Sequence, residues 1–69
     1  MTVQAVEKRH GIIREIFAHE NFGWITDTNW QEIRFILSSL TDQVSEGMRV
    51  QFDIQMVDNQ LIAVDVENC

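Results

Sequence analysis

The sequence predicts an all-β protein, a five-stranded antiparallel barrel with a short 3₁₀ turn after the third strand. Three observations favour this fold. Five short segments rich in β-branched and aromatic residues follow one another, turn-forming residues separate them, and no convincing helical pattern appears between them. The chain is short and has no proline, and closure into a barrel removes strand edges that it could not otherwise cover.

The first three strands are predicted over residues 11–36. Residues 11–17 mix β-branched apolar residues with charged ones and begin at a glycine, which favours a strand. After a turn over residues 18–21, residues 22–27 alternate large apolar residues with small or polar ones and form the second strand of a hairpin. A turn over residues 28–31 leads to a third strand over residues 32–36, in which Ile33 and Phe35 share one face.

Residues 37–40 are too few for an α-helix, and polar residues follow them, so they predict a single 3₁₀ turn. The alternation in residues 49–57 predicts a half-buried fourth strand, with inward positions at Val50, Phe52, Ile54 and Met56.

Asp58 and Asn59 both tolerate a positive φ, which predicts a tight two-residue turn after the fourth strand. The fifth strand follows this turn. Its expected inward residues are Leu61 and Ala63, with Val64 and Val66 as further candidates, and Asp65 interrupts the pattern.

Length and composition define the class of protein. We expect a single domain over residues 1–69, in which residues 1–9 either fray or extend the first strand. Cys69 is the sole cysteine, so no disulfide can form within the chain, and His10 and His19 lack the spacing of a zinc site. We therefore expect no metal and no cofactor.

No segment resembles a signal peptide or a membrane span, which together with a free thiol favours the cytoplasm and no membrane partner. The chain has no glycine-rich phosphate loop and no nucleophile beside a histidine in a known motif, so we do not expect this protein to be an enzyme. The formal net charge of -6 argues against strong attraction to polyphosphate.

The order of elements carries residues that resemble the bacterial cold-shock domain. They are Gly11, residues 21–25 (Asn-Phe-Gly-Trp-Ile), residues 32–40 (Glu-Ile-Arg-Phe-Ile-Leu-Ser-Ser-Leu) and residues 46–47 (Glu-Gly). The resemblance covers residues 11–66 and implies a divergent member of that family with an OB-fold barrel. It also implies binding of single-stranded RNA or DNA, because such domains stack unpaired bases on outward aromatic side chains.

Positions that are core in this related fold also match the inward phase of the predicted strands. The expected core is Ile13, Ile25, Ile33, Phe35, Leu40, Val50, Phe52 and Ile54.

The resemblance places the nucleic-acid-binding residues at Phe22, Trp24, Arg34, Arg14 and Phe17. Phe22 and Trp24 keep the aromatics of the first RNA-binding motif. Arg34 replaces an aromatic of the second motif, although its guanidinium plane can stack on a base. Arg14 retains a cation of the first strand, and Phe17 adds an aromatic.

Other positions depart from the family pattern. Glu15 stands at the stacking tryptophan, Ile36 and Leu37 stand where the second motif has histidine and phenylalanine, and Glu20 replaces a lysine. We expect Arg14 and Arg34 to form solvated ion pairs with nearby glutamates. Trp30, in a turn, is predicted to cover the barrel mouth.

Two functions remain open at this point. The first is a weak, sequence-tolerant module that binds single-stranded RNA or DNA by base stacking. The alternative is an OB module that has lost this activity and binds a protein partner or a second copy of itself. Its apolar patch would consist of Ile16, Phe17, Trp24, Ile36 and Leu37.

Overall fold

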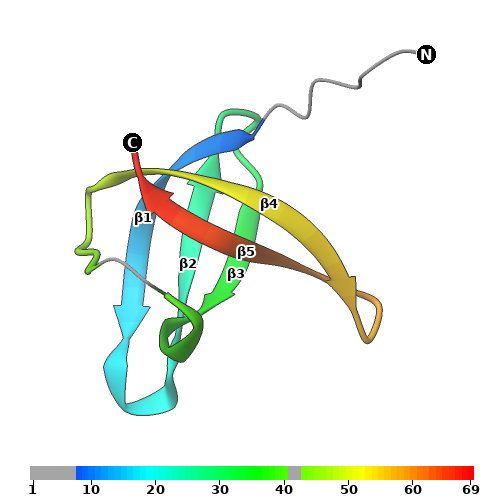
Figure 1. Ribbon diagram of the computed structural model, residues 1–69, viewed down its shortest axis with the longest axis horizontal. Coiled ribbons are helices and arrows are strands. Elements are labelled where there is room, and N and C mark those ends of the chain that lie inside the picture. Colours follow the sequence, from blue (N-terminus) through cyan, green and yellow to red (C-terminus); the bar gives the residue numbers. More distant parts are fainter. Residues whose placement is uncertain (1–7, 41–42) are drawn as a thin grey trace.

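The computed structural model describes residues 8–40 and 43–69. Within these residues the chain forms five strands and two short 3₁₀ helices (Figure 1). The strands are β1 (Arg9–Phe17), β2 (Phe22–Asp27), β3 (Glu32–Ile36), β4 (Arg49–Val57) and β5 (Gln60–Asn68). The 3₁₀ helices are η1 (Ala18–Glu20), between β1 and β2, and η2 (Leu37–Ser39), directly after β3. The all-β class and the predicted 3₁₀ turn are both confirmed.

The strands close into a barrel in the order β1-β2-β3-β5-β4. Figure 1 shows the long β4–β5 hairpin curving across the sheet made by β1, β2 and β3. All neighbouring strands are antiparallel except β3 and β5, which are parallel where Arg34 lies beside Ile62 and Phe35 beside Ala63. The barrel therefore closes as predicted, with one parallel pair at the closing seam.

The strand bounds follow the sequence pattern closely. β2, β3 and β4 have the predicted bounds, whereas β1 begins earlier than expected because Arg9 pairs with Phe52 of β4. Of the two alternatives for residues 1–9, extension of the strand holds for Arg9, and residues 1–7 lie outside the described part of the chain. Asp58 and Asn59 have φ angles of 51° and 65°, which confirms the tight turn between β4 and β5.

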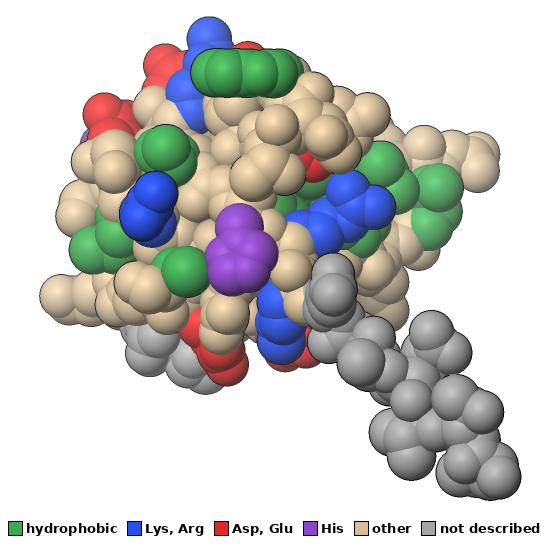
Figure 2. All heavy atoms as spheres, turned by 90° about the horizontal axis from the view of Figure 1, so that it is seen from above, with side chains coloured by type: hydrophobic (Ala, Val, Ile, Leu, Met, Phe, Trp, Pro, Cys, Tyr) green, Lys and Arg blue, Asp and Glu red, His purple; other side chains and the backbone are tan. Residues whose placement is uncertain are grey.

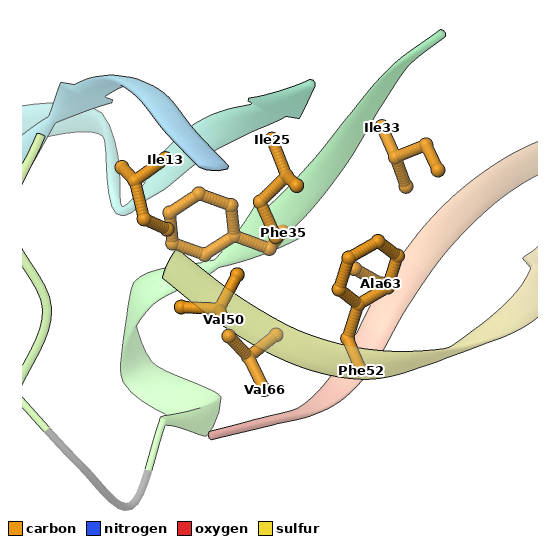
Figure 3. Close-up of a cluster of buried hydrophobic side chains, with 8 residues drawn as sticks. All are labelled: Ile13, Ile25, Ile33, Phe35, Val50, Phe52, Ala63 and Val66. Atoms are coloured by element: carbon orange, nitrogen blue, oxygen red, sulfur yellow. The ribbon is translucent and has the colours of Figure 1, made fainter. Parts of the chain in front are cut away.

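Eight apolar side chains form the buried core (Figure 3): Ile13, Ile25, Ile33, Phe35, Val50, Phe52, Ala63 and Val66. Leu40 and Ile54 are only partly buried and pack against this cluster. Met56 and Leu61, predicted to point inward, are instead 62% and 46% exposed. These two residues pair with each other near the tip of the β4–β5 hairpin, where no other strand covers them.

A β-bulge in β5 explains how both Ala63 and Val66 reach the core. Val64 pairs with Asp53 and Glu67 pairs with Gln51, so β5 has one residue more than β4 between these pairs. Asp65 lies in this stretch with a φ of 53°. The extra residue shifts the alternation by one position, and Val66 therefore points inward although it lies three residues after Ala63.

Candidate nucleic-acid interface

The outer face of β1, β2 and β3 depends on a second bulge, located at Arg14. Ile13 pairs with Ile25 in the core, but Glu15 pairs with Trp24, so β1 has one residue more than β2 between these pairs. The extra residue shifts the alternation along β1. Consequently Glu15, rather than Arg14, becomes the cross-strand neighbour of Trp24 on the outer face.

β2 occupies the centre of this face, and its outward side chains have neighbours on both sides. Trp24 lies between Glu15 of β1 and Arg34 of β3. In the next row along the strand, Phe22 lies between Phe17 and Ile36. Two aromatic residues on β2 are therefore flanked by an aromatic residue on β1 and an arginine on β3.

Phe22 contacts three other members of the predicted site. Its ring centroid lies 5.0 Å from that of Phe17, and the two rings are tilted by 30°. The Cζ atom of Arg34 lies 4.6 Å from the Phe22 centroid, within the range of a cation–π contact. Trp24 meets Phe22 edge to face at 6.1 Å, so these two rings do not stack on one another.

Gly23 allows the strand between these two aromatics to lie close against the core. A Cβ atom at Gly23 would stand 2.6 Å from the carbonyl oxygen of Glu15 and 2.7 Å from the ring of Phe35. The close approach at this glycine involves the Phe35 side chain and the β1 backbone. It fixes Phe22 and Trp24 to a rigid part of the barrel wall.

Arg14 and Arg34 have different surroundings. Arg14 follows the prediction of an ion pair, because its Nη1 atom lies 2.8 Å from Glu32 Oε2 and 3.9 Å from Glu15 Oε1. None of the ion pairs within the described residues involves Arg34, whose buried Nε atom makes no hydrogen bond. Arg34 is therefore held by its contact with Phe22, which differs from the expected ion pair.

Phe17, Phe22, Trp24 and Arg34 thus form one contiguous group, which we call the stacking cluster. All four side chains are half-buried, so part of each remains open to a ligand. Arg14 is not part of this cluster and forms an ion pair with Glu32 instead. In the apolar patch expected for a protein partner, Ile16 and Leu37 are half-buried and pack against the core.

Trp30 does not cover the barrel mouth, contrary to prediction. It is 86% exposed, at the tip of the β2–β3 loop. The loop is organised by Asp27, which is buried and which sequence reasoning did not select. An aspartate at a strand end followed by an asparagine two positions later was the available signal, since aspartate often caps such turns.

The described residues contain no group of three or more side chains suited to holding a metal ion. No helix among them is long and apolar enough to cross a membrane.

Comparison with known proteins finds similarity in structure and no match by sequence. No protein-family model matches the sequence, and no curated protein matches it. Among solved structures the chain is similar to Drosophila Unr CSD456, a cold-shock domain structure, with a TM-score of 0.76. The similarity covers 91% of this chain at 16% sequence identity, and 27% of the other chain. At this identity the similarity concerns the fold alone, and it agrees with the predicted OB-fold barrel.

Proposed function

We propose that the protein binds unpaired stretches of RNA or DNA on the outer face of β1, β2 and β3. The stacking cluster is the observation that carries this proposal. Its aromatic rings and the Arg34 guanidinium offer flat surfaces of the kind on which bases stack, and every base has such a surface. The fold similarity to a cold-shock domain supports the same use of this face.

Binding of this kind involves no chemical reaction. A base stacked on Trp24 or Phe17 cannot pair with a complementary base while it is bound, so the protein holds a strand open. Trp24 is the best single platform, because its edge-to-face contact with Phe22 leaves the indole unstacked within the protein. The proposed site favours no particular sequence, because stacking does not read the hydrogen-bonding edges of a base.

The expected affinity is low. Stacking is worth about 1 to 3 kcal/mol per base, and millimolar affinity corresponds to about 4 kcal/mol. Two or three occupied platforms supply about 2 to 9 kcal/mol before the cost of association is subtracted, so we expect binding that is near millimolar at best. The net charge of -6 adds no general attraction, and Glu15 lies directly beside Trp24.

An NMR titration with a thymidine trinucleotide and a uridine trinucleotide at low salt tests the proposal. We expect amide shifts on β2 and β3 around Phe22, Trp24 and Arg34. A spectrum that stays unchanged at millimolar ligand would contradict the proposal and leave the face to a protein partner. Sedimentation at rising protein concentration then tests whether that partner is a second copy.

Two substitutions of Trp24 separate stacking from simple apolar contact. Trp24→Phe retains an aromatic face and should keep most of the trinucleotide affinity, whereas Trp24→Leu retains apolar bulk alone and should lose about tenfold or more. Met56→Ala serves as a control, because Met56 is exposed at the tip of the β4–β5 hairpin. Equal affinities for the Phe and Leu variants would place the bases elsewhere.

A further inference from the structure

The loop between β2 and β3 is a rigid support for Trp30. Asp27 Oδ1 accepts hydrogen bonds from the backbone N–H groups of Asn29 and Gln31, at 2.8 and 2.9 Å. The Trp30 N–H donates to the Asp27 carbonyl at 3.0 Å, and the Asp27 N–H donates to the Gln31 carbonyl at 2.9 Å. Four hydrogen bonds thus close the loop and fix the direction in which Trp30 points.

Trp30 occupies the position in this loop that glycine usually takes. A three-residue hairpin loop commonly ends in a residue with left-handed backbone, and Trp30 has a φ of 64°. A bulky side chain in this region is a strained outlier, and here it is also 86% exposed. The fold therefore gains little from the indole, neither through burial nor through backbone preference. Outliers of this kind concentrate at functional sites.

A pocket of about 460 Å³ lies beside Trp30. The indole forms one wall together with Ile12, Arg14 and the threonines of this end of β2 and its loop, Thr26 and Thr28. The lining is mostly apolar, and the volume lies in the lower range of small-ligand sites. Figure 2, viewed from above the end where β1 begins, shows hydrophobic side chains reaching the surface beside basic ones.

This pocket continues the outer face that carries the stacking cluster. Thr26 pairs with Ile12 on one side and Glu32 on the other, which forms the row directly after Glu15, Trp24 and Arg34. Outward rows along a strand lie about 7 Å apart. A strand that stacks on Trp24 and runs along β2 would therefore reach the pocket without crossing the barrel.

We infer that the Trp30 pocket is a further base-binding subsite, which takes one base of a single strand that also occupies the stacking cluster. This inference rests on the proposed function and specifies its extent. The indole supplies the stacking surface, Ile12 an apolar floor, and Thr26 and Thr28 supply hydroxyl groups for the edge of the base. A short oligonucleotide occupies the stacking cluster alone, and only a longer one reaches Trp30.

Glu32 limits the affinity of this subsite. Its carboxylate lies 2.8 Å from Arg14 Nη1 and so occupies the cation that lines the pocket. A phosphate next to the bound base would meet a neutralised Arg14 and the negative Glu32. Removing the Glu32 charge therefore frees Arg14 for a phosphate oxygen.

The indole N–H resonances of the two tryptophans report the two subsites separately. We expect a thymidine trinucleotide to shift the Trp24 indole signal alone and an octanucleotide to shift both signals. If the Trp24 indole signal shifts and the Trp30 signal does not at any oligonucleotide length, the inference is overturned and the proposed function is retained. If the Trp30 signal alone shifts, bases bind in the pocket and not on the stacking cluster, which overturns the shared site proposed here. If neither signal shifts, both proposals are overturned.

Two variants change the octanucleotide affinity in opposite directions. Trp30→Gly suits the backbone of the loop, so it should fold, and it should lose about fivefold to tenfold in octanucleotide affinity with no change for the trinucleotide. Glu32→Gln should gain about threefold or more for the octanucleotide at low salt. An octanucleotide affinity of Trp30→Gly equal to that of the parent protein would overturn the inference and leave the exposed indole to a protein contact.

Discussion

At the residue scale, Trp30 combines backbone strain with exposure. Left-handed backbone costs an L-residue about 1 to 2 kcal/mol, and glycine escapes this cost. Because the indole is 86% exposed, its removal sacrifices little buried area. The Trp30 side chain therefore lowers the stability of the fold, whereas the core side chains raise it.

Replacement of Trp30 by glycine should consequently stabilise the protein. We expect Trp30→Gly to raise the free energy of unfolding by about 0.5 to 1 kcal/mol, which is the strain released minus the added flexibility of glycine in the unfolded chain. Trp30→Ala keeps the strained backbone and should change it by less than about 0.5 kcal/mol. Urea titration measures both. A destabilised Trp30→Gly would mean that the indole packs on the barrel after all.

Gly23 differs from Trp30 because neighbouring atoms leave no space for a side chain at this position. A Cβ atom there would stand 2.6 Å from the Glu15 carbonyl and 2.7 Å from the Phe35 ring, and the backbone oxygen cannot move aside cheaply. We expect Gly23→Ala to lower the free energy of unfolding by about 2 to 3 kcal/mol. Gly47→Ala is the matched control, since Gly47 has a φ of 88° but open space around it, and it should cost about 1 kcal/mol. Thermal or urea unfolding measures both variants. Equal losses in the free energy of unfolding for Gly23→Ala and Gly47→Ala would show that the atoms around Gly23 move aside for the added methyl group.

At the scale of elements, the β2–β3 hairpin depends on one carboxylate. Asp27 is buried, and its Oδ1 atom accepts two of the four loop hydrogen bonds. Its Oδ2 atom makes no hydrogen bond within the described residues and lies 3.7 Å from Arg9 Nη1. The fold of this loop therefore needs an oxygen at the Oδ1 position more than it needs the negative charge.

Two substitutions at Asp27 test this point. Asp27→Asn keeps an oxygen acceptor for the N–H groups of Asn29 and Gln31 and should cost about 1 kcal/mol. Asp27→Ala removes both bonds and should cost about 2 to 4 kcal/mol, with faster hydrogen exchange at those two amides. Similar losses for both variants would indicate that the Arg9 pairing, rather than the loop hydrogen bonds, is the important contact.

Elements with a clear alternation were predictable from sequence, and their irregularities were not. The bounds of β2 and β3 follow from the placement of Ile25, Ile33 and Phe35, which are all buried. The bulge at Arg14 leaves no mark on hydropathy, and the interruption of the pattern at Asp65 does not by itself reveal a bulge, yet each bulge changes which side chains face inward. Sequence periodicity assigns faces within a strand, but the register between strands decides which faces meet.

The candidate site likewise has some features that the sequence predicted and others that it did not. Phe22, Trp24 and Arg34 were predicted together from the resemblance to the cold-shock domain, and the pairing of β2 with β3 makes Trp24 and Arg34 direct neighbours. An ion pair of Arg14 with a nearby glutamate was predicted, but the sequence did not single out Glu32, which lies on β3 and is separated from β1 in the sheet by β2. Exposure at Met56, Leu61 and Trp30 depends on where the barrel ends, which is a property of the assembled fold.

At the scale of the whole molecule, charge determines how strongly any nucleic acid is attracted. The chain carries 5 basic and 11 acidic residues. Three of the basic side chains are matched with carboxylates, Lys8 with Asp53 at 3.3 Å, Arg9 with Asp27 at 3.7 Å and Arg14 with Glu32 at 2.8 Å. Arg34 is the member of the stacking cluster that can meet a phosphate.

Affinity for a single strand should therefore depend only weakly on salt. Each phosphate that a protein neutralises contributes a slope of about -0.7 to a plot of log affinity against log salt concentration. With Arg34 as the main cation at the site, we expect a slope near that value for a thymidine trinucleotide between low and moderate salt. Arg34→Gln should flatten the slope towards zero, while Arg49→Gln, on β4, should leave it unchanged. A slope steeper than about -2 would require several phosphate contacts, and binding would then be dominated by charge rather than by stacking on β2.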